Sequence, residues 1–184
     1  MKTGIHYDLV SGPLGTMLLV ARGDGLTGIH FEGERYQPSI GAGWQRAPGH
    51  PLLRAAQAQL EEYFAGRRTR FDLPLAPVGT PFQRAVWAAI GAVPFGATIA
   101  YRELAARVGR PGSIRAAGTA TGRNPWTIVV PCHRIVGADG TLTGYAGGLD
   151  RKRALLALEA GVDGGLLRDA PAARGCRVES PLAD

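Results

Sequence analysis

A stretch near the middle of the chain, RRTRFDLPLAPVG at residues 67–79, divides two segments with different patterns. Its prolines, with Pro81 just after it, cannot continue a helix or a central strand, because the ring removes the amide hydrogen and fixes φ. Strand-like sequence precedes the stretch and helical sequence follows it. We therefore expect two domains, at residues 1–76 and 77–163, and a flexible C-terminal tail at 164–184.

The first domain is expected to contain a small sheet and one helix. YDLV, TMLLVAR and LTGIHF have strand character, and the GDG between the last two can adopt positive φ in a tight turn. A Gly/Pro-rich loop follows at residues 37–51. In LLRAAQAQLEEYFAG, apolar residues recur at helical spacing, and Gly66 is a suitable helix end.

The second domain is expected to be helical. In TPFQRAVWAAI, Thr80 can cap a helix, Pro81 suits its first turn and Gln83 can complete a capping box. TIAYRELAARVG and IRAAGTATGRN predict two short helices joined by a turn at GRPGS, with Ser113 as the cap of the second. Helix, turn, helix is the outline of a DNA-binding motif, although the same outline occurs in many folds.

The second of these short helices carries few long side chains, because it consists mainly of alanine, glycine and threonine, including Ala116 and Gly118. Such a helix cannot read a major groove through long side chains, but its backbone can approach a narrow groove closely. Tight packing against a neighbouring helix is the alternative explanation.

The positive charge of the chain is concentrated in the same domain. Residues 80–160 contain nine arginines and one lysine against four acidic residues, so this segment alone has a net charge of +6, equal to that of the whole chain. A surface with this bias attracts polyanions, most commonly nucleic acid. Many basic faces bind nothing, however, so charge alone leaves both interpretations open.

The sequence IVVPCHRIVG places a cysteine between a proline and a histidine, after the apolar run WTIVV, which we expect to be a strand. Pro131 disfavours helical geometry at the residue before it and should hold Cys132 on a fixed turn. His133 can assist thiolate formation through a bound water. Glu159, on an amphipathic helix expected in LDRKRALLALEAG, can orient and charge-stabilise an imidazole. An inert core cysteine and a solvated glutamate are the alternatives.

Several functional classes are disfavoured by composition. The two cysteines, Cys132 and Cys176, are too few for a disulfide scaffold and form no C-x-x-C pair. No stretch approaches the roughly 20 apolar residues that a membrane span needs, and the N-terminus lacks the apolar core of a signal peptide. We expect a cytoplasmic protein with no membrane contact, metal or cofactor, in which Cys176 is an incidental thiol.

The segment NPWTIVVPCHRIVGADGTLTGYAGGLDRKRALLALE, with TPFQRAVW and AYRELA upstream, closely resembles the 6-O-alkylguanine-DNA alkyltransferase family, densely over residues 80–161 and loosely before them. The resemblance implies an α/β + α fold, with a small N-terminal ribonuclease H-like α/β domain followed by a helical C-terminal domain with a (winged) helix-turn-helix. It also implies DNA repair by stoichiometric, irreversible transfer of an alkyl group from 6-O-alkylguanine to an internal cysteine. 4-O-alkylthymine is a further candidate substrate.

The resemblance assigns roles to individual residues. The alkyl acceptor falls on Cys132, the water-linked histidine on His133 and the charge-stabilising glutamate on Glu159. Asn124 matches the hinge asparagine. Tyr101 matches the tyrosine that rotates the 3′ phosphate of the lesion and helps to protonate the departing guanine.

The same resemblance implies that the partner is double-stranded DNA. A monomer is expected to bind the DNA through the minor groove, with the alkylated guanine flipped out of the duplex. Cooperative binding along DNA is left open. Arg115 matches the arginine that replaces the flipped base. The other residues expected to contact DNA are Tyr101, Ser113, Ala116 and Gly118. The residues expected to form the lesion pocket are Tyr145, Ile135, Ala146 and Thr127.

Some positions depart from the family pattern. Thr127 stands where human-type members carry a proline, and Ala146 stands where they carry a serine, so the tolerance for bulky alkyl groups is open. The zinc site of some relatives has no counterpart, because the N-terminal domain has no cysteine.

Two other functional classes are also considered. A lesion-binding module without an acceptor would not need Cys132, His133 and Glu159 together. A thiol hydrolase would turn over and would need an oxyanion hole, for which the sequence gives no sign.

Overall fold

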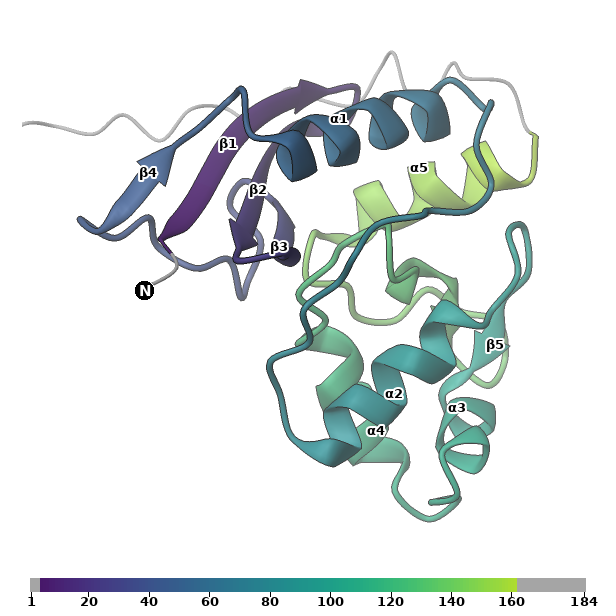
Figure 1. The fold of residues 1–184 in the computed structure, drawn as a ribbon. Coiled ribbons are helices and arrows are strands. Elements are labelled where there is room, and N and C mark those ends of the chain that lie inside the picture. The colour runs from purple at the N-terminus through teal and green to yellow at the C-terminus, as the bar shows by residue number, and fades with distance from the viewer. Residues whose placement is uncertain (1–3, 162–184) are drawn as a thin grey trace, which may run out of the picture.

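The structure is a computed structural model that describes residues 4–161. In Figure 1 the sheet and the helix that follows it form the upper part, the last helix lies close below that helix, and the other helices form the lower part. The tail expected at residues 164–184, with Cys176, lies outside the described residues. No helix within residues 4–161 has the length and apolar character needed to cross a membrane.

The N-terminal sheet has the strand order β3-β2-β1-β4. The three expected strands are confirmed: β1 (Ile5–Gly12), β2 (Gly15–Arg22) and β3 (Gly25–Phe31) form an antiparallel meander. β4 (Trp44–Arg46) pairs in parallel with β1 inside the segment expected to be a loop. Three residues are too few to produce a recognisable strand pattern.

The expected helix after the sheet is α1 (Pro51–Phe64), which packs over the strands (Figure 1). Its buried side consists of Leu53, Ala56, Leu60 and Tyr63. Gly66, just beyond its end, has φ of 70°, a conformation that favours glycine. The prediction of this helix and of its end is confirmed.

The second segment contains the expected helices, which are α2 (Pro81–Gly91), α3 (Tyr101–Arg107), α4 (Ile114–Gly122) and α5 (Leu149–Glu159). The capping box of Thr80 and Gln83 is present at α2. Ser113 occupies the N-cap position of α4, but its side chain makes no capping hydrogen bond. β5 (Ile99–Ala100) replaces the first turn of the helix expected in TIAYRELAARVG, because these residues pair in parallel with β6 (Ile135–Val136).

The strand expected at WTIVV is wrong. The segment folds back on itself, because the backbone N–H of Val130 donates to the carbonyl of Trp126 at 2.9 Å. Ile128 has φ of 73°, which no regular strand contains. Trp126 forms only an isolated bridge to Ile29. The run is apolar because the turn is buried, and an apolar run cannot by itself distinguish the two structures.

α5 also departs from the amphipathic pattern expected for it. Its buried residues include Lys152 and Glu159 beside Ala154 and Leu155. Two charged side chains on the inward side of a helix need polar partners there, and these partners lie in the candidate site.

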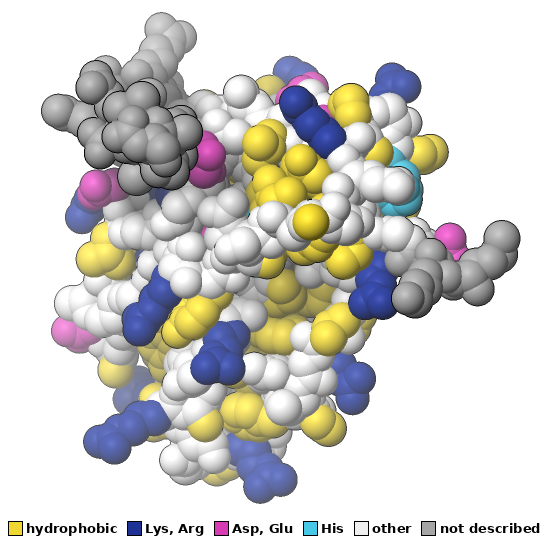
Figure 2. Space-filling view, turned by 90° about the vertical axis from the view of Figure 1, so that its left-hand side faces the viewer, with side chains coloured by type: hydrophobic (Ala, Val, Ile, Leu, Met, Phe, Trp, Pro, Cys, Tyr) yellow, Lys and Arg dark blue, Asp and Glu magenta, His cyan; other side chains and the backbone are white. Residues whose placement is uncertain are grey.

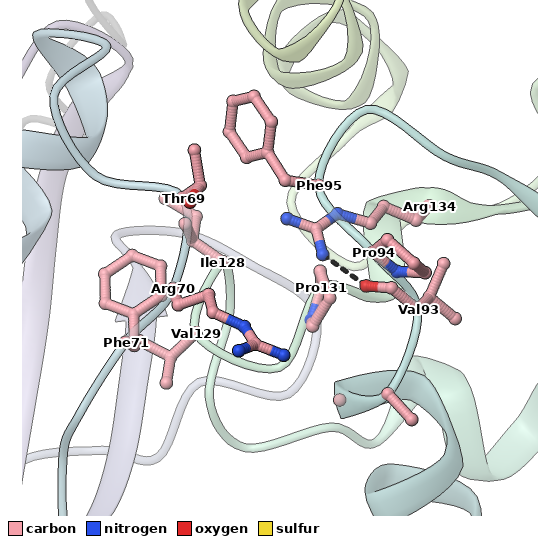
Figure 3. Close-up of a pocket in the computed structure, with 12 residues that line it drawn as sticks. Thr69, Arg70, Phe71, Val93, Pro94, Phe95, Ile128, Val129, Pro131 and Arg134 are labelled. Carbon is pink, nitrogen blue, oxygen red and sulfur yellow. Dashed lines mark hydrogen bonds between the residues drawn. The ribbon is translucent and has the colours of Figure 1, made fainter.

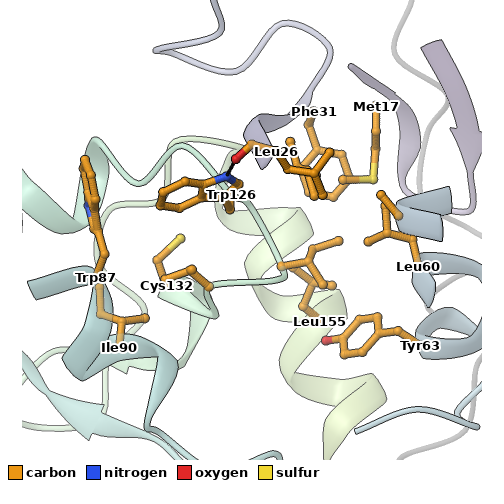
Figure 4. Packing of buried hydrophobic residues seen from close by; sticks show 14 of the residues in the cluster. Met17, Leu26, Phe31, Leu60, Tyr63, Trp87, Ile90, Trp126, Cys132 and Leu155 are labelled. Carbon is orange, nitrogen blue, oxygen red and sulfur yellow. Dashed lines mark hydrogen bonds between the residues drawn. The ribbon is translucent and has the colours of Figure 1, made fainter. Parts of the chain in front are cut away.

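One hydrophobic core joins both parts of the chain. Figure 4 shows Met17, Phe31 and Leu60 on one side and Trp87 and Trp126 on the other. The indole N–H of Trp126 donates to the carbonyl of Leu26 in β3 at 2.8 Å. The core therefore fixes the position of the helical part relative to the sheet.

Candidate active site

Cys132 begins a single 3-10 turn, Cys132–Arg134, directly after the folded-back WTIVV segment. Cys132 is only 6% exposed. The side-chain amide of Asn124 donates to the Cys132 sulfur at 3.2 Å and to the Val130 carbonyl at 2.7 Å. The side-chain oxygen of Asn124 accepts from the backbone N–H of Trp126 at 3.0 Å. Asn124 therefore links the end of α4 to the turn that carries the thiol.

The Cys132 thiol is held in its neutral form. Burial raises the pKa of Cys132 to about 11, although the hydrogen bond from Asn124 acts in the opposite direction. Since the thiolate is the nucleophile, a base must take the proton before the sulfur can react.

Glu159, the last residue of α5, accepts hydrogen bonds from five donors. Its Oε1 accepts from Tyr63, His133 and Arg134 at 2.7–2.8 Å, and its Oε2 accepts from Arg134 and the backbone N–H of Gly96 at 2.8 and 3.0 Å. Burial alone would raise the pKa of Glu159, but the hydrogen bonds from His133 and Arg134 bring it to about 2. The carboxylate is therefore ionised at neutral pH.

An ionised Glu159 determines the tautomer of His133. A carboxylate only accepts, so the His133 Nε2, 2.8 Å from Oε1, carries the proton. Burial lowers the pKa of His133, which makes the ring neutral and leaves Nδ1 as a lone-pair acceptor. Nδ1 is buried and has no hydrogen-bond partner within residues 4–161. This nitrogen is available to take a proton.

Sequence reasoning missed three residues of this site, namely Tyr63, Arg134 and Lys152. Arg134 stands in the quoted motif, next to His133, so its charge and position were a usable signal. Tyr63 lies in α1, and its bond to Glu159 joins residues 96 positions apart, which leaves no local trace. Burial raises the pKa of the Tyr63 hydroxyl, which therefore remains a donor.

Lys152 is fully buried on α5. Its ammonium donates to the carbonyls of Ile135 and Thr143 at 2.6 and 2.8 Å. Burial lowers the pKa of Lys152 to about 8. The residue ties α5 to the segment after the 3-10 turn.

Behind the thiol turn, a cavity of about 540 Å³ is lined by both parts of the chain, including Phe71, Phe95 and Pro131 (Figure 3). Arg134 lines this cavity and donates to the carbonyl of Val93, which lies beside it, at 2.6 Å (Figure 3). Its guanidinium lies 5.7 Å from the centre of the Phe95 ring. These contacts hold Arg134 in place to pair with Glu159.

A second hollow, a groove of about 610 Å³, lies along α4. The structure brings five predicted residues to its lining: Tyr101, Arg115, Gly118, Tyr145 and Ala146. A Cβ added at Gly118 would lie 3.7 Å from the Tyr101 ring, at ordinary van der Waals distance, so Tyr101 lies beside this part of α4. Burial raises the pKa values of Tyr101 and Tyr145, so both hydroxyls carry their protons.

The other predicted residues do not line this groove. Ser113 and Ala116 lie at the start of α4, where Ala116 is exposed. Thr127 is buried, and its hydroxyl donates to Glu34 at 3.0 Å. Ile135 is also buried, and its carbonyl accepts from Lys152. Within residues 4–161 no cluster of three or more His, Cys, Asp or Glu side chains could hold a metal ion.

Basic side chains cover the face around the helical part. In Figure 2, Lys and Arg side chains are spread over the lower half of the molecule, at the height of α2, α3 and α4 in Figure 1, where acidic side chains are few. The charge bias seen in the sequence is therefore found on the molecular surface.

Comparisons with known proteins point to one family. Residues 5–77 match the model of the 6-O-methylguanine DNA methyltransferase ribonuclease-like domain, and residues 81–161 match that of its DNA binding domain. A methylated-DNA–protein-cysteine methyltransferase of Mycolicibacterium paratuberculosis is 48% identical over 155 residues, covering 84% of this chain and 92% of the relative. One from Methanosarcina barkeri is 44% identical, covering 84% and 97%.

The fold agrees with solved structures. A crystal structure of Mycobacterium tuberculosis OGT in complex with DNA aligns with a TM-score of 0.81 and 42% identity, covering 89% of this chain and 98% of that one. The expected fold class, a ribonuclease-like α/β domain followed by a helical DNA-binding domain, is confirmed.

Proposed function

The chain belongs to the 6-O-methylguanine DNA methyltransferase family, and we propose that Cys132 is the residue that accepts the alkyl group. The family's activity is DNA repair by transfer of the alkyl group from 6-O-alkylguanine to a cysteine of the protein, and this chain has that activity. One observation carries the assignment to Cys132: it is the only cysteine in the matched residues 5–161.

The neighbouring residues supply the proton transfers. The thiol proton passes, through a water, to the Nδ1 of His133, and the charge of Glu159 stabilises the resulting imidazolium. This proposal is supported by the free Nδ1 and by the 2.8 Å contact between Nε2 and Glu159.

The thiolate of Cys132 then attacks the alkyl carbon. A C–S bond forms while the bond between that carbon and the guanine oxygen breaks, and the electron pair of the broken bond goes to the guanine. Tyr101 donates its hydroxyl proton to the departing guanine, and solvent water then takes the proton held by His133 and returns one to Tyr101. None of the side chains that residues 4–161 bring around Cys132 can hydrolyse a thioether, so each molecule reacts once.

DNA binds along the groove beside α4. The small side chains of α4 let its backbone enter the minor groove, and Arg115 takes the place of the lesion base when that base is flipped toward Cys132. Tyr145 and Ala146, which line the groove, form part of the wall that receives the base. The protein acts as a monomer in this proposal.

The substitution Cys132→Ser tests the assignment. A hydroxyl is far less acidic than a thiol, so transfer from methylated duplex should be lost, while binding to undamaged duplex should be retained because the basic surface is unchanged. Transfer and binding are measured on the same preparations. Transfer at the wild-type rate by the serine variant would show that another residue is the acceptor.

A further inference from the structure

We propose that Arg35, Tyr36 and Arg123 form a second DNA contact, which grips the sugar–phosphate backbone of the duplex that occupies the groove. This inference rests on the proposed function and extends the DNA surface from the helix-turn-helix to the N-terminal domain. Arg35, Tyr36 and Arg123 together form the arginine–tyrosine cluster.

Two residues of the cluster, Arg35 and Tyr36, come from the N-terminal domain, and Arg123 is the C-cap residue of α4. Arg35 and Tyr36, in the segment after β3, line the groove together with Arg115 and Gly118 of α4. Tyr36 also reaches the end of α4, since a Cβ added at Gly122 would lie 3.8 Å from its ring. A duplex that lies against α4 must therefore pass this segment of the N-terminal domain.

The cluster concentrates positive charge that has no internal partner. The guanidinium carbons of Arg35 and Arg123 lie 5.4 and 5.8 Å from the centre of the Tyr36 ring. In the described part of the chain neither guanidinium pairs with a carboxylate. The ring attracts both cations, and an anion bound between or above them would relieve their mutual repulsion.

The Tyr36 ring itself is unusually exposed for a large aromatic side chain, at 42%. An exposed ring flanked by two planar guanidinium groups is a preorganised donor surface, because Arg presents several N–H groups in a fixed plane that fits a phosphate. Of the polyanions that a basic face attracts, duplex DNA is the one that this family handles.

The segment that carries Arg35 and Tyr36 is fixed by hydrogen bonds to buried residues. The buried carboxylate of Glu34 accepts from Thr127 at 3.0 Å and from the backbone N–H of Phe31 at 3.1 Å, and it contacts His30 at 2.6 Å. The backbone N–H of Arg35 donates to the carbonyl of Ala146 at 3.2 Å. The backbone of this segment therefore has little conformational entropy left to lose when a phosphate binds.

The test uses salt dependence, which reports the number of phosphates neutralised. Dissociation constants for undamaged duplex are measured over a series of salt concentrations for the wild type and for the double variant Arg35→Ala/Arg123→Ala. The slope of log K against log salt should fall by about 0.9 or more, the value for one phosphate no longer neutralised. The variant Arg35→Lys/Arg123→Lys should recover most of that slope.

Arg54→Ala is the matched control. Arg54 is exposed on α1, and it forms no ion pair within the described residues. Its replacement by alanine removes one positive charge, as the replacement of each cluster arginine does, but leaves the groove unchanged. It should leave the slope at the wild-type value. If the double alanine variant behaves as Arg54→Ala does, the cluster does not contact phosphate.

A second readout separates this inference from the fold and from the proposed function. Repair of methylated duplex should fall more in the double alanine variant than reaction with a free 6-O-alkylguanine base, because the base alone has no phosphate backbone. Equal losses in both reactions would overturn the inference, since the variant would then damage the fold or the pocket. If wild-type protein neither binds duplex nor transfers a methyl group, the proposed function fails as well.

Discussion

At the scale of single residues, the chemistry depends on one buried set of charges. Glu159 is ionised because Arg134 and His133 donate to it, and its charge in turn fixes the His133 tautomer that leaves Nδ1 free. The thiol of Cys132 itself stays protonated in the resting state. We therefore propose that the site controls reactivity by placing a base near a protonated thiol rather than by holding a permanent thiolate.

The pKa of Glu159 makes the stability of the fold depend on pH. A carboxyl whose pKa is lowered from 4.5 to about 2 on folding contributes stability that is complete above pH 4.5 and is lost as pH falls toward 2. In Glu159→Gln this contribution is absent, and Arg134 is left buried without a counter-charge, which should cost roughly 3–5 kcal/mol.

Denaturant unfolding at pH 7, 5 and 3 measures both effects. Wild-type protein should lose more unfolding free energy between pH 5 and 3 than Glu159→Gln. Equal losses in the two proteins would mean that another group dominates the acid sensitivity.

Arg115 separates extrusion of the lesion from the chemistry. An unstacked, unpaired base leaves a gap that costs a few kcal/mol unless a side chain occupies it, and Arg115 is the long basic side chain on α4 that lines the groove. Arg115→Ala should slow repair of 6-O-methylguanine in duplex markedly, while reaction with the free base is affected much less. Arg115→Lys should restore little of the duplex reaction if gap filling and hydrogen bonding matter more than charge.

Rates on duplex and on free base are compared for the three proteins. Loss of both reactions to the same extent would assign Arg115 to the fold or the pocket. Full recovery with lysine would make it only a phosphate contact.

At the scale of the elements, the longer helices and strands could be predicted from the sequence, whereas the short strands β4, β5 and β6 and the buried turn could not. Helical spacing and a capping box indicate α1 and α2 in the sequence, and apolar runs indicate β1 to β3. The buried turn between Asn124 and Cys132 has the same apolar composition as a strand, because burial and not the backbone conformation selects those residues. Its shape depends on hydrogen bonds from the Asn124 side chain.

The candidate site was predictable to a similar degree. Cys132, His133 and Asn124 lie close together in the sequence, where their order carries information. The contacts of Tyr63 with Glu159 and of Glu34 with Thr127 join the two domains, and they become visible only when the chain is folded.

The turn gives a prediction of its own. Asn124→Ala removes the donor to the Val130 carbonyl and to the Cys132 sulfur, so it should cost about 1–3 kcal/mol of unfolding free energy and slow methyl transfer. Thr127→Val is the comparison, because it removes a hydrogen bond from the same turn without touching the thiol. Both variants are examined by denaturant unfolding and by single-turnover transfer. If Thr127→Val slows transfer as much as Asn124→Ala, contact with the sulfur is not what matters.

At the scale of the whole molecule, the two domains operate as one body. A shared core and the Tyr63–Glu159 contact tie the ribonuclease-like domain to the thiol turn. The basic helical part attracts DNA, and the groove beside α4 lies at the junction where both domains contribute residues. The N-terminal domain therefore supports the site through Tyr63, which donates to the Glu159 carboxylate that in turn orients His133.

The central claim is that Cys132 takes up one alkyl group and keeps it. The direct measurement is intact mass of the full chain after incubation with an excess of methylated oligonucleotide, followed by peptide mapping. We predict a gain of one methyl group per molecule, located on the peptide that contains Cys132, with repair stopping at one equivalent of base. Methylation on the peptide that contains Cys176, or repair that continues beyond one equivalent, would contradict the account.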